Sequence, residues 1–283
     1  MLFLLFWELD ATCCTIRQEV SSNVNAVRVL WEHRQVLRML VLRDLQRQYT
    51  KFRLGYLWSL LEPLGMALVL WLVFSVLLGD RALGLQPYLL FLSVAILPWW
   101  WFLKSVQAST KIFRRMRGEI AFSGLPLQIW VLRTVISSMV EFIFSLPVIL
   151  IAVAVTGFLP GPWIALFPVA IALQFLLLYG IGLLVASLTV VAPDVTRVVK
   201  IILRAMFYLS PILYSISNIP ASVQPIAALN PLVGILGLYR IGWWPEEQTS
   251  VWALVTSLSV AAGFLIAGLI TFKVLKPRIL KEA

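Results

Sequence analysis

Six long stretches of the chain are almost entirely apolar, and shorter polar stretches separate them. The apolar stretches cover residues 56–78, 87–103, 129–156, 163–191, 198–214 and 251–275. A helix needs about 20 mostly apolar residues to cross the hydrocarbon core of a bilayer. The pattern therefore predicts an all-α integral membrane protein with six transmembrane helices. Pro98 and Pro211 interrupt the second and the fifth of them.

Lysine and arginine residues gather in alternate connections between these stretches. Basic clusters precede the first stretch, follow the second and the fourth, and close the chain; they include Arg43, Arg47, Arg114, Arg115, Arg197, Lys200, Arg204, Lys276 and Arg278. Cytoplasmic loops carry an excess of basic residues. We therefore expect both termini on the cytoplasmic side, as an even number of crossings requires.

The segment 215–245 is also apolar, but Pro220, Pro225 and Pro231 divide it. Proline removes a backbone donor and breaks a helix interior. We therefore expect short re-entrant or outer helices between the fifth and sixth spans rather than a seventh crossing. The predicted organisation is a cytoplasmic segment 1–55, a transmembrane domain 56–275 with a cytoplasmic loop at about 104–128, and a cytoplasmic tail 276–283.

Residues 27–49, before the first span, are rich in Arg and Leu and read as an amphipathic interface helix. Leu37, Val41, Leu45 and Tyr49 recur at a spacing of four, which places them on one helical stripe. Such a helix lies at the membrane surface with its arginines reaching toward water. The alternative is an ordinary basic flank of the first span.

Composition and chemistry narrow the function. Hydrophobic residues make up 61% and charged residues 13% of the chain, which excludes an ordinary soluble domain. The net charge is +10, but the basic residues that produce it gather in the connections between apolar stretches, where they orient a membrane protein. We therefore expect no nucleic-acid partner. The sequence has no phosphate-binding G-x-x-x-x-G-K-[ST] motif and no His/Cys/Asp/Glu cluster at metal-ligand spacing, so we predict neither a metal site nor a cofactor on this chain.

Apart from Lys200, Arg204 and Lys273, which belong with the basic connections, the charged residues inside the apolar stretches are Glu62, Arg133 and Glu141. Ionisable groups are costly at the bilayer centre and face cavities or other helices. Glu62 and Glu141 either line a cavity or pair with another span, or they bond locally. For Arg133 we expect a side chain that reaches back to the cytoplasmic surface. Arg133 and Glu141 are eight residues apart, too far for direct pairing within one helix.

The 12 tryptophans are the main aromatic feature. Trp243 and Trp244 are candidates for an interfacial belt. Trp99, Trp100 and Trp101 follow Pro98, and they belong either to such a belt or to aromatic walls that stack on sugar rings. Small residues at a spacing of four predict close helix packing; they are Gly182 and Ala186 in the fourth stretch and Ser259, Gly263 and Ala267 in the sixth.

Residues 42–63, LRDLQRQYTKFRLGYLWSLLEP, resemble the N-terminal signature of ABC-2 type permeases that export cell-surface polysaccharides such as O-antigen, capsule and teichoic acid. Further matches follow in order along the chain, at Pro193-Asp194-Val195, Ser210-Pro211, Tyr214, Ile219-Pro220, Asn230-Pro231 and Tyr239-Arg240. The resemblance covers roughly residues 30–278.

The resemblance implies a homodimer in which each protomer binds a separate ATPase subunit, which carries ATP and Mg²⁺, and in which the spans enclose a channel for a lipid-linked glycan. The chain is then a non-enzymatic transport subunit in a bacterial cytoplasmic membrane, surrounded by membrane lipids. The implied ATPase contacts are Asp44, Arg47, Arg114, Arg115, Glu119 and Phe122. The implied glycan path comprises Tyr56, Trp58, Glu62, Trp99, Trp100, Trp101 and Glu141.

Other functions remain open from the sequence. An ABC-2 permease can carry a drug or a small lipid instead of a glycan, and a cell-wall galactan exporter is one plausible subtype. A membrane-embedded transferase is disfavoured because no polar catalytic cluster is evident. A secondary transporter is disfavoured by sparse membrane carboxylates and by the lack of an internal repeat.

Overall fold

A computed structural model describes residues 33–49, 54–77, 84–246 and 250–282, and all regular elements in these ranges are helical. Residues 1–32, which include Cys13, Cys14 and the first part of the predicted interface helix, lie outside the described residues.

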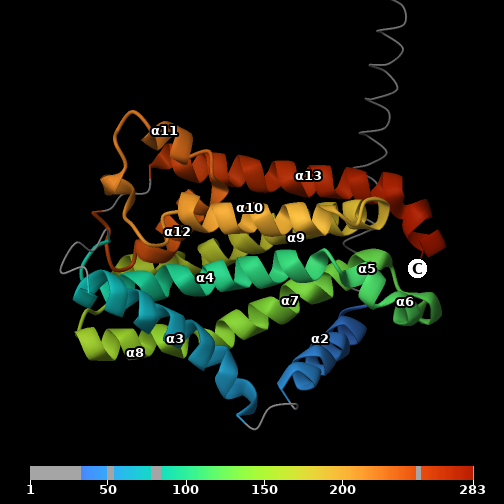
Figure 1. Cartoon of the computed structure of the whole chain (residues 1–283), viewed down its shortest axis with the longest axis horizontal. Coiled ribbons are helices and arrows are strands. Elements are labelled where there is room, and N and C mark those ends of the chain that lie inside the picture. The colour runs from blue at the N-terminus through green and yellow to red at the C-terminus, as the bar shows by residue number, and fades with distance from the viewer. Residues whose placement is uncertain (1–32, 50–53, 78–83, 247–249, 283) are drawn as a thin grey trace, which may run out of the picture.

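Five helical stretches of the described chain are long and apolar enough to cross a membrane (Figure 1). The first is α3 (Trp58–Trp71), which the π-helical η2 (Leu72–Leu77) continues, and the second is α4 (Tyr88–Ser109). The third joins α7 (Leu127–Ser145) to α8 (Pro147–Thr156), and the fourth joins η3 (Pro162–Leu166) to α9 (Phe167–Val191). The fifth is most of α13 (Val251–Glu282). Five predicted spans are thus confirmed by length and composition.

The remaining predicted span, 198–214, is shorter than expected. It corresponds to α10 (Val195–Leu209), whose 15 residues extend about 22 Å. The helix ends at Ser210, which has an extended backbone and precedes Pro211. The residue before a proline is disfavoured in the helical region, so the sequence stops the helix here. Among the described residues, five helices rather than six therefore reach the length of a bilayer span.

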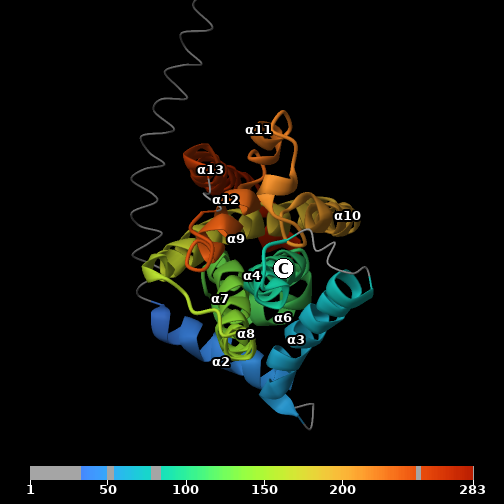
Figure 2. The ribbon, with the colours of Figure 1, turned by 90° about the vertical axis from the view of Figure 1, so that its left-hand side faces the viewer.

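Helix α4 lies at the centre of the bundle. In the end-on view of Figure 2, it is surrounded by α3, α7, α9 and α10, and 16 of its 22 residues are buried. Pro98 does not end α4, and the buried side chain of Gln174 on α9 donates a hydrogen bond of 2.8 Å to the Pro98 carbonyl. Trp101 stacks on Phe142 of α7 with ring centroids 5.3 Å apart. The second predicted span is therefore a continuous, buried helix.

Helices α9 and α13 pack closely through glycines. A Cβ on Gly180 would lie 2.5 Å from the Leu265 backbone nitrogen, and one on Gly268 would lie 2.4 Å from the Gly180 carbonyl oxygen. The prediction of close packing is confirmed at Gly182, where a Cβ would lie 3.0 Å from the side chains of Ser109 and Val131, and it is wrong at Gly263. Gly263 faces open space, and Gly182 faces α4 and α7 instead of α13.

Short helices occupy the two ends of the bundle (Figure 1). At one end, α5 (Ile112–Arg115) and α6 (Arg117–Ser123) lie near the carboxyl end of α13. At the other end lie η4 (Ile216–Asn218), α11 (Gln224–Ala227) and α12 (Pro231–Arg240). The prediction that prolines divide the segment 215–245 into short helices is confirmed.

Arg240, at the end of α12, fastens this end of the bundle. Its guanidinium donates to the carbonyls of Pro211 and Ile212 at 2.6 and 3.0 Å and lies 3.5 Å from the centre of the Phe91 ring. Trp243 and Trp244 are only 7% and 8% exposed. The interpretation of these two tryptophans as an exposed belt is therefore wrong, because they pack into the core of the protomer.

Helix α2 (Arg34–Tyr49) lies against α7, and the short η1 (Gly55–Leu57) precedes α3 (Figures 1 and 2). Val41 and Leu45 are buried, and Leu37 packs beside them against Ile136 and Val140 of α7. The predicted stripe is thus real at these three positions. Its partner is a helix of the same protein.

Candidate functional site

Arg133 on α7 is completely buried, yet it carries a charge. Its Nε and Nη2 donate to the two carboxylate oxygens of Asp44 on α2, and its guanidinium lies 5.3 Å from the Trp130 ring centre. A buried guanidinium needs a counterion because burial removes its hydration. The expectation that Arg133 reaches the cytoplasmic surface is therefore wrong: α2 brings the carboxylate to the arginine.

Glu119 on α6 extends this contact into a cluster. Its carboxylate lies 3.1 Å from Arg43 and 3.2 Å from Arg47, one helical turn apart on α2, and 3.6 Å from Arg133. We call Arg43, Asp44, Arg47, Glu119 and Arg133 the α2–α6–α7 ion cluster. It joins three helices that are separate in sequence, at the end of the bundle that carries α5 and α6 (Figure 1).

The electrostatics of Glu119 follow from its neighbours. Partial burial alone favours the neutral acid, but the hydrogen bond from Arg47 and the charges of Arg43 and Arg133 outweigh it and lower the pKa of Glu119 below its usual value. Glu119 is therefore ionised at neutral pH, and the cluster holds three guanidinium groups against two carboxylates.

The outer surface of α5 and α6 differs from their inner surface. Ile112, Phe113, Met116 and Ile120 are buried against the bundle. The opposite side carries the exposed Arg114 and Arg115, and Phe122 is 94% exposed near the end of α6. Gly124 ends the helix with φ of 60°. The two short helices therefore carry basic side chains and one large apolar side chain on their exposed surface.

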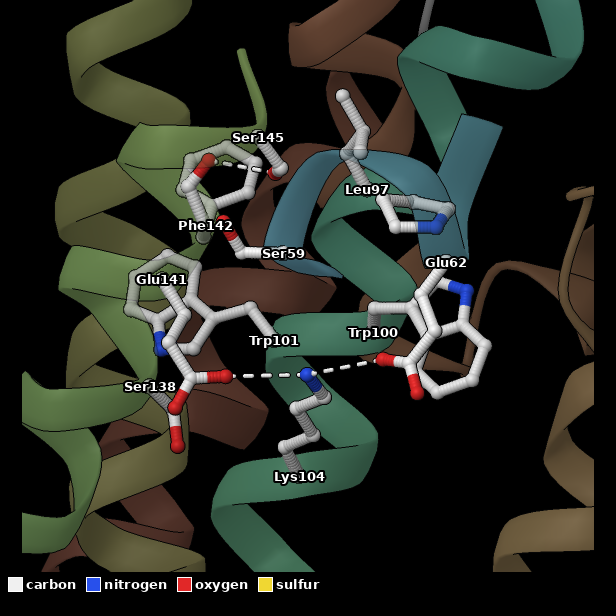
Figure 3. Close-up of a pocket in the computed structure, with 11 residues that line it drawn as sticks. Ser59, Glu62, Leu97, Trp100, Trp101, Lys104, Ser138, Glu141, Phe142 and Ser145 are labelled. Atoms are coloured by element: carbon white, nitrogen blue, oxygen red, sulfur yellow. Dashed lines mark hydrogen bonds and ion pairs between the residues drawn. The ribbon is translucent and has the colours of Figure 1, made fainter. Parts of the chain in front are cut away.

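A second polar cluster lies deeper between α3, α4 and α7 (Figure 3). Lys104 on α4 is 3.0 Å from Glu141 on α7 and 3.5 Å from Glu62 on α3, and its ammonium lies 5.7 Å from the Trp100 ring centre. Glu141 is nearly buried at 9% side-chain exposure, whereas Glu62 is 52% exposed. The two carboxylates thus share one cation, and one of them reaches the surface.

The pocket around Lys104 is small in this conformation. Its lining includes Ser59, Trp100, Trp101, Ser138 and Ser145 together with the three charged residues. The cavity holds about 20 Å³, which is room for a single water molecule. A sugar ring does not fit without a movement of α3 or of a side chain.

Residues 35–244 match the family described as ABC-2 type transporter. The chain belongs to this family.

Named relatives of this ABC-2 transporter chain cover most of its length. It is 27% identical over 246 residues to the O-antigen export system permease protein RfbA of Myxococcus xanthus, which covers 86% of this chain and 94% of the relative. It is 28% identical over 199 residues to RfbA of Klebsiella pneumoniae, covering 70% and 76% of the two chains. It is 25% identical over 208 residues to the polysialic acid transport protein KpsM of Escherichia coli, covering 71% and 78%.

The structure separates the predicted ATPase contacts of this ABC-2 transporter chain into two groups. Arg114, Arg115 and Phe122 point outward. Asp44 and Glu119 instead bind arginines of the same chain, and Arg47 both contacts Glu119 and remains half exposed. The contact with an ATPase stays a prediction for all six residues of the set.

The predicted glycan-path residues divide similarly. Trp58 is 43% exposed on α3, and Trp100 is half-buried beside Glu62 and Glu141. Trp99 is 5% exposed and packs on Phe102 and Phe207. Trp101 is 2% exposed, although its edge reaches the pocket. Tyr56 lies in η1, and its side chain is outside the described part of the chain. Trp99 is thus a core residue, while Trp100 stays a path candidate.

Two functional features escaped the sequence reasoning. Lys104 counts as a loop residue in the hydrophobicity pattern, but α4 continues to Ser109 and places Lys104 between the two carboxylates. The resemblance implies that Asp44 contacts the ATPase, and no sequence pattern pairs it with Arg133. The sequence did contain one signal. Arg133 lies in an apolar stretch with no carboxylate near it on the same helix, so a carboxylate from another segment has to pair with it.

Proposed function

We propose that this chain is the permease subunit of an ATP-driven exporter that moves a lipid-linked polysaccharide across a bacterial cytoplasmic membrane. The observation that carries the proposal is the similarity to the O-antigen export permease RfbA over 86% of this chain and 94% of the relative. The similarity to KpsM, named for polysialic acid transport, supports a polysaccharide as the cargo.

In this proposal, α10 is the sixth crossing. Helix α9 ends near α5 and α6, and α12 begins at the opposite end of the bundle, so α10 carries the chain back between them (Figure 1). Six crossings put both termini on the cytoplasmic side, with α5 and α6. This orientation agrees with the basic residues of those segments.

Two copies of the chain then assemble with two ATPase subunits, which bind ATP and Mg²⁺. The exposed Phe122 inserts into an apolar pocket of the ATPase, and Arg114 and Arg115 contact acidic groups around it. Closure of the ATPase pair displaces α5 and α6. The α2–α6–α7 ion cluster transmits this displacement to α7 and α2 and so opens the channel. The permease chain itself makes and breaks no covalent bond.

The proposed cargo is tested by depleting the protein in its native cell and analysing lipid-linked glycans on the cytoplasmic side. We expect one polymer to accumulate there, attached to its lipid, and to disappear when the wild-type chain is restored. If the protein is absent and no lipid-linked glycan changes, the chain exports a drug or a small lipid instead.

The proposed ATPase contact is tested with Phe122→Glu. This side chain makes no buried contact within the protomer, so the variant should fold like the wild type but lose the ATPase subunit during purification. The matched control is Ile226→Glu, a 66% exposed position on α11 at the opposite end. Retention of the ATPase by Phe122→Glu would contradict the assignment.

A further inference from the structure

Helix α10 presents three different faces. Val199 and Leu203 are buried against the bundle. Three basic residues, Arg197, Lys200 and Arg204, follow at spacings of three and four and are all exposed, so they form one stripe along the helix. A third stripe beside them is apolar and exposed; it comprises Val198, Ile201, Ile202, Ala205, Tyr208 and Leu209.

None of the three basic side chains of α10 forms a hydrogen bond or an ion pair with a residue that the structure describes. This separates them from Lys104 and Arg133, which both contact carboxylates of the same chain. Within the part of the chain that the structure describes, the positive charge of the α10 stripe is therefore not neutralised and can bind an anion.

The positions of Lys200 and Arg204 along α10 increase the need for a nearby anion or for water. Lys200 and Arg204 lie about 8 and 14 Å from the first residue of α10, at 1.5 Å per residue. If α10 is a crossing helix, as proposed above, Arg204 lies well below the membrane surface. A charge at that depth requires an anion or a water-filled space beside it.

We propose that α10 binds a phosphorylated lipid, with the phosphate groups on Arg197, Lys200 and Arg204 and the hydrocarbon chain along the exposed apolar stripe. The stripe places three positive charges within about 11 Å along the helix axis, which suits a multiply charged anion such as a diphosphate. Arginine guanidinium groups bind phosphate through paired hydrogen bonds. The adjoining apolar face favours an anion that carries a long apolar chain over free phosphate.

This inference rests on the proposed function when it assigns the phosphorylated lipid to the cargo. The lipid end of the glycan then engages α10 as it enters the membrane domain, and the sugar chain follows. An anionic phospholipid of the bilayer has the same chemistry, and the experiment below distinguishes the two.

The test measures binding of a fluorescent polyprenyl diphosphate to the full-length chain in nanodiscs of phosphatidylcholine. The variant Lys200→Gln/Arg204→Gln removes two charges from the α10 stripe. The control Lys276→Gln/Arg278→Gln removes two exposed charges from the end of α13. We expect about a tenfold or greater loss of affinity for the α10 variant and about a twofold or smaller change for the control.

Additional variants and competitors distinguish a loss of the binding site from a folding defect. The variant Lys200→Arg/Arg204→Lys keeps the charge and should bind the probe like the wild type. A polyprenol without phosphate should not compete with the probe. Equal competition by phosphatidylglycerol would assign the stripe to bilayer lipid and overturn the cargo assignment. Unchanged binding by the Lys200→Gln/Arg204→Gln variant would overturn the α10 site.

The two proposals fail in different ways. If depletion leaves every lipid-linked glycan unchanged while the probe still requires Lys200 and Arg204, the polysaccharide function is wrong and the α10 site stands. If glycan accumulates on depletion but the α10 charges do not affect probe binding, the function stands and the α10 site is wrong.

Discussion

Arg133 and Asp44 lie 89 residues apart in the chain and form a two-bond ion pair that fastens α2 to α7. The Arg133 side chain is fully buried, whereas the Asp44 side chain is 27% exposed to solvent. The pair therefore sits at the boundary between the bundle and its surroundings. Arg133 also lies 3.6 Å from Glu119, which connects the pair to α6.

Replacing one partner of this pair should cost more stability than replacing both. Asp44→Asn leaves the buried Arg133 without its nearest anion, and we expect a loss of about 3–5 kcal/mol. Arg133→Met/Asp44→Asn removes the stranded charge and should recover part of that loss. Thermal unfolding of the purified chain in detergent measures both. Equal midpoints for the single and the double variant would show that the pair is not coupled.

Glu119 should make the attachment of α6 dependent on pH and salt. Its pKa is lowered in the folded state, so its contribution to stability is present above the ordinary glutamate value of about 4.3 and is lost as pH falls through the lowered value. Arg43 and Arg47 are half exposed, so salt should weaken their contacts. Hydrogen exchange of α6 measures this, and Glu119→Gln should abolish the acid-dependent component.

Lys104 should be more important for Glu141 than for Glu62. Lys104→Met leaves the nearly buried Glu141 without its cation and should cost about 1–3 kcal/mol. Lys104→Met/Glu141→Gln should restore much of the stability. Glu62→Gln should change it by about 1 kcal/mol or less, because Glu62 is half exposed. A larger effect of Glu62→Gln than of Lys104→Met in detergent melts would contradict this arrangement.

The close contact of α9 and α13 should tolerate no added side chain. In Gly268→Leu the Cβ alone would lie 2.4 Å from the Gly180 carbonyl oxygen, so we expect a loss of about 1–3 kcal/mol or more. Gly263→Leu, five residues earlier on the same helix, meets open space and serves as the control. A similar melting temperature for both variants would show that the helices separate easily.

Substitutions of the adjacent Trp99 and Trp100 should have different effects, the first on stability and the second on export. Trp99→Ala removes a buried side chain and should cost about 3–5 kcal/mol. Trp100→Ala alters the pocket lining and should lower export while leaving the melting temperature almost unchanged. Trp58→Ala on exposed α3 should behave like Trp100→Ala. Normal export in both Trp58→Ala and Trp100→Ala, at wild-type protein levels, would exclude an aromatic cargo path here.

The long spanning helices and the short helices of segment 215–245 could be predicted from the sequence because both depend on the residues of the segment itself. Hydrocarbon thickness sets the length of a spanning helix, so the sequence predicts five of the stretches, although 87–103 and 251–275 each end six residues before the observed span ends. Pro211, Pro220 and Pro231 lie between helices or at the start of one, which explains why the described part of segment 215–245 forms only short helices. Pro63, Pro98 and Pro277 lie inside helices and do not end them.

The sequence by itself thus determined the helical membrane architecture, the inward stripe of α2 and the family resemblance, because each is written in residue types and their spacing. The tertiary structure alone decided which charges meet. Arg133 finds Asp44, and Lys104 finds Glu62 and Glu141, across 37 to 89 residues of chain. Periodicity tells which face of a helix is apolar, but not which distant helix supplies its counterion. Burial makes that partner obligatory, and only packing identifies it.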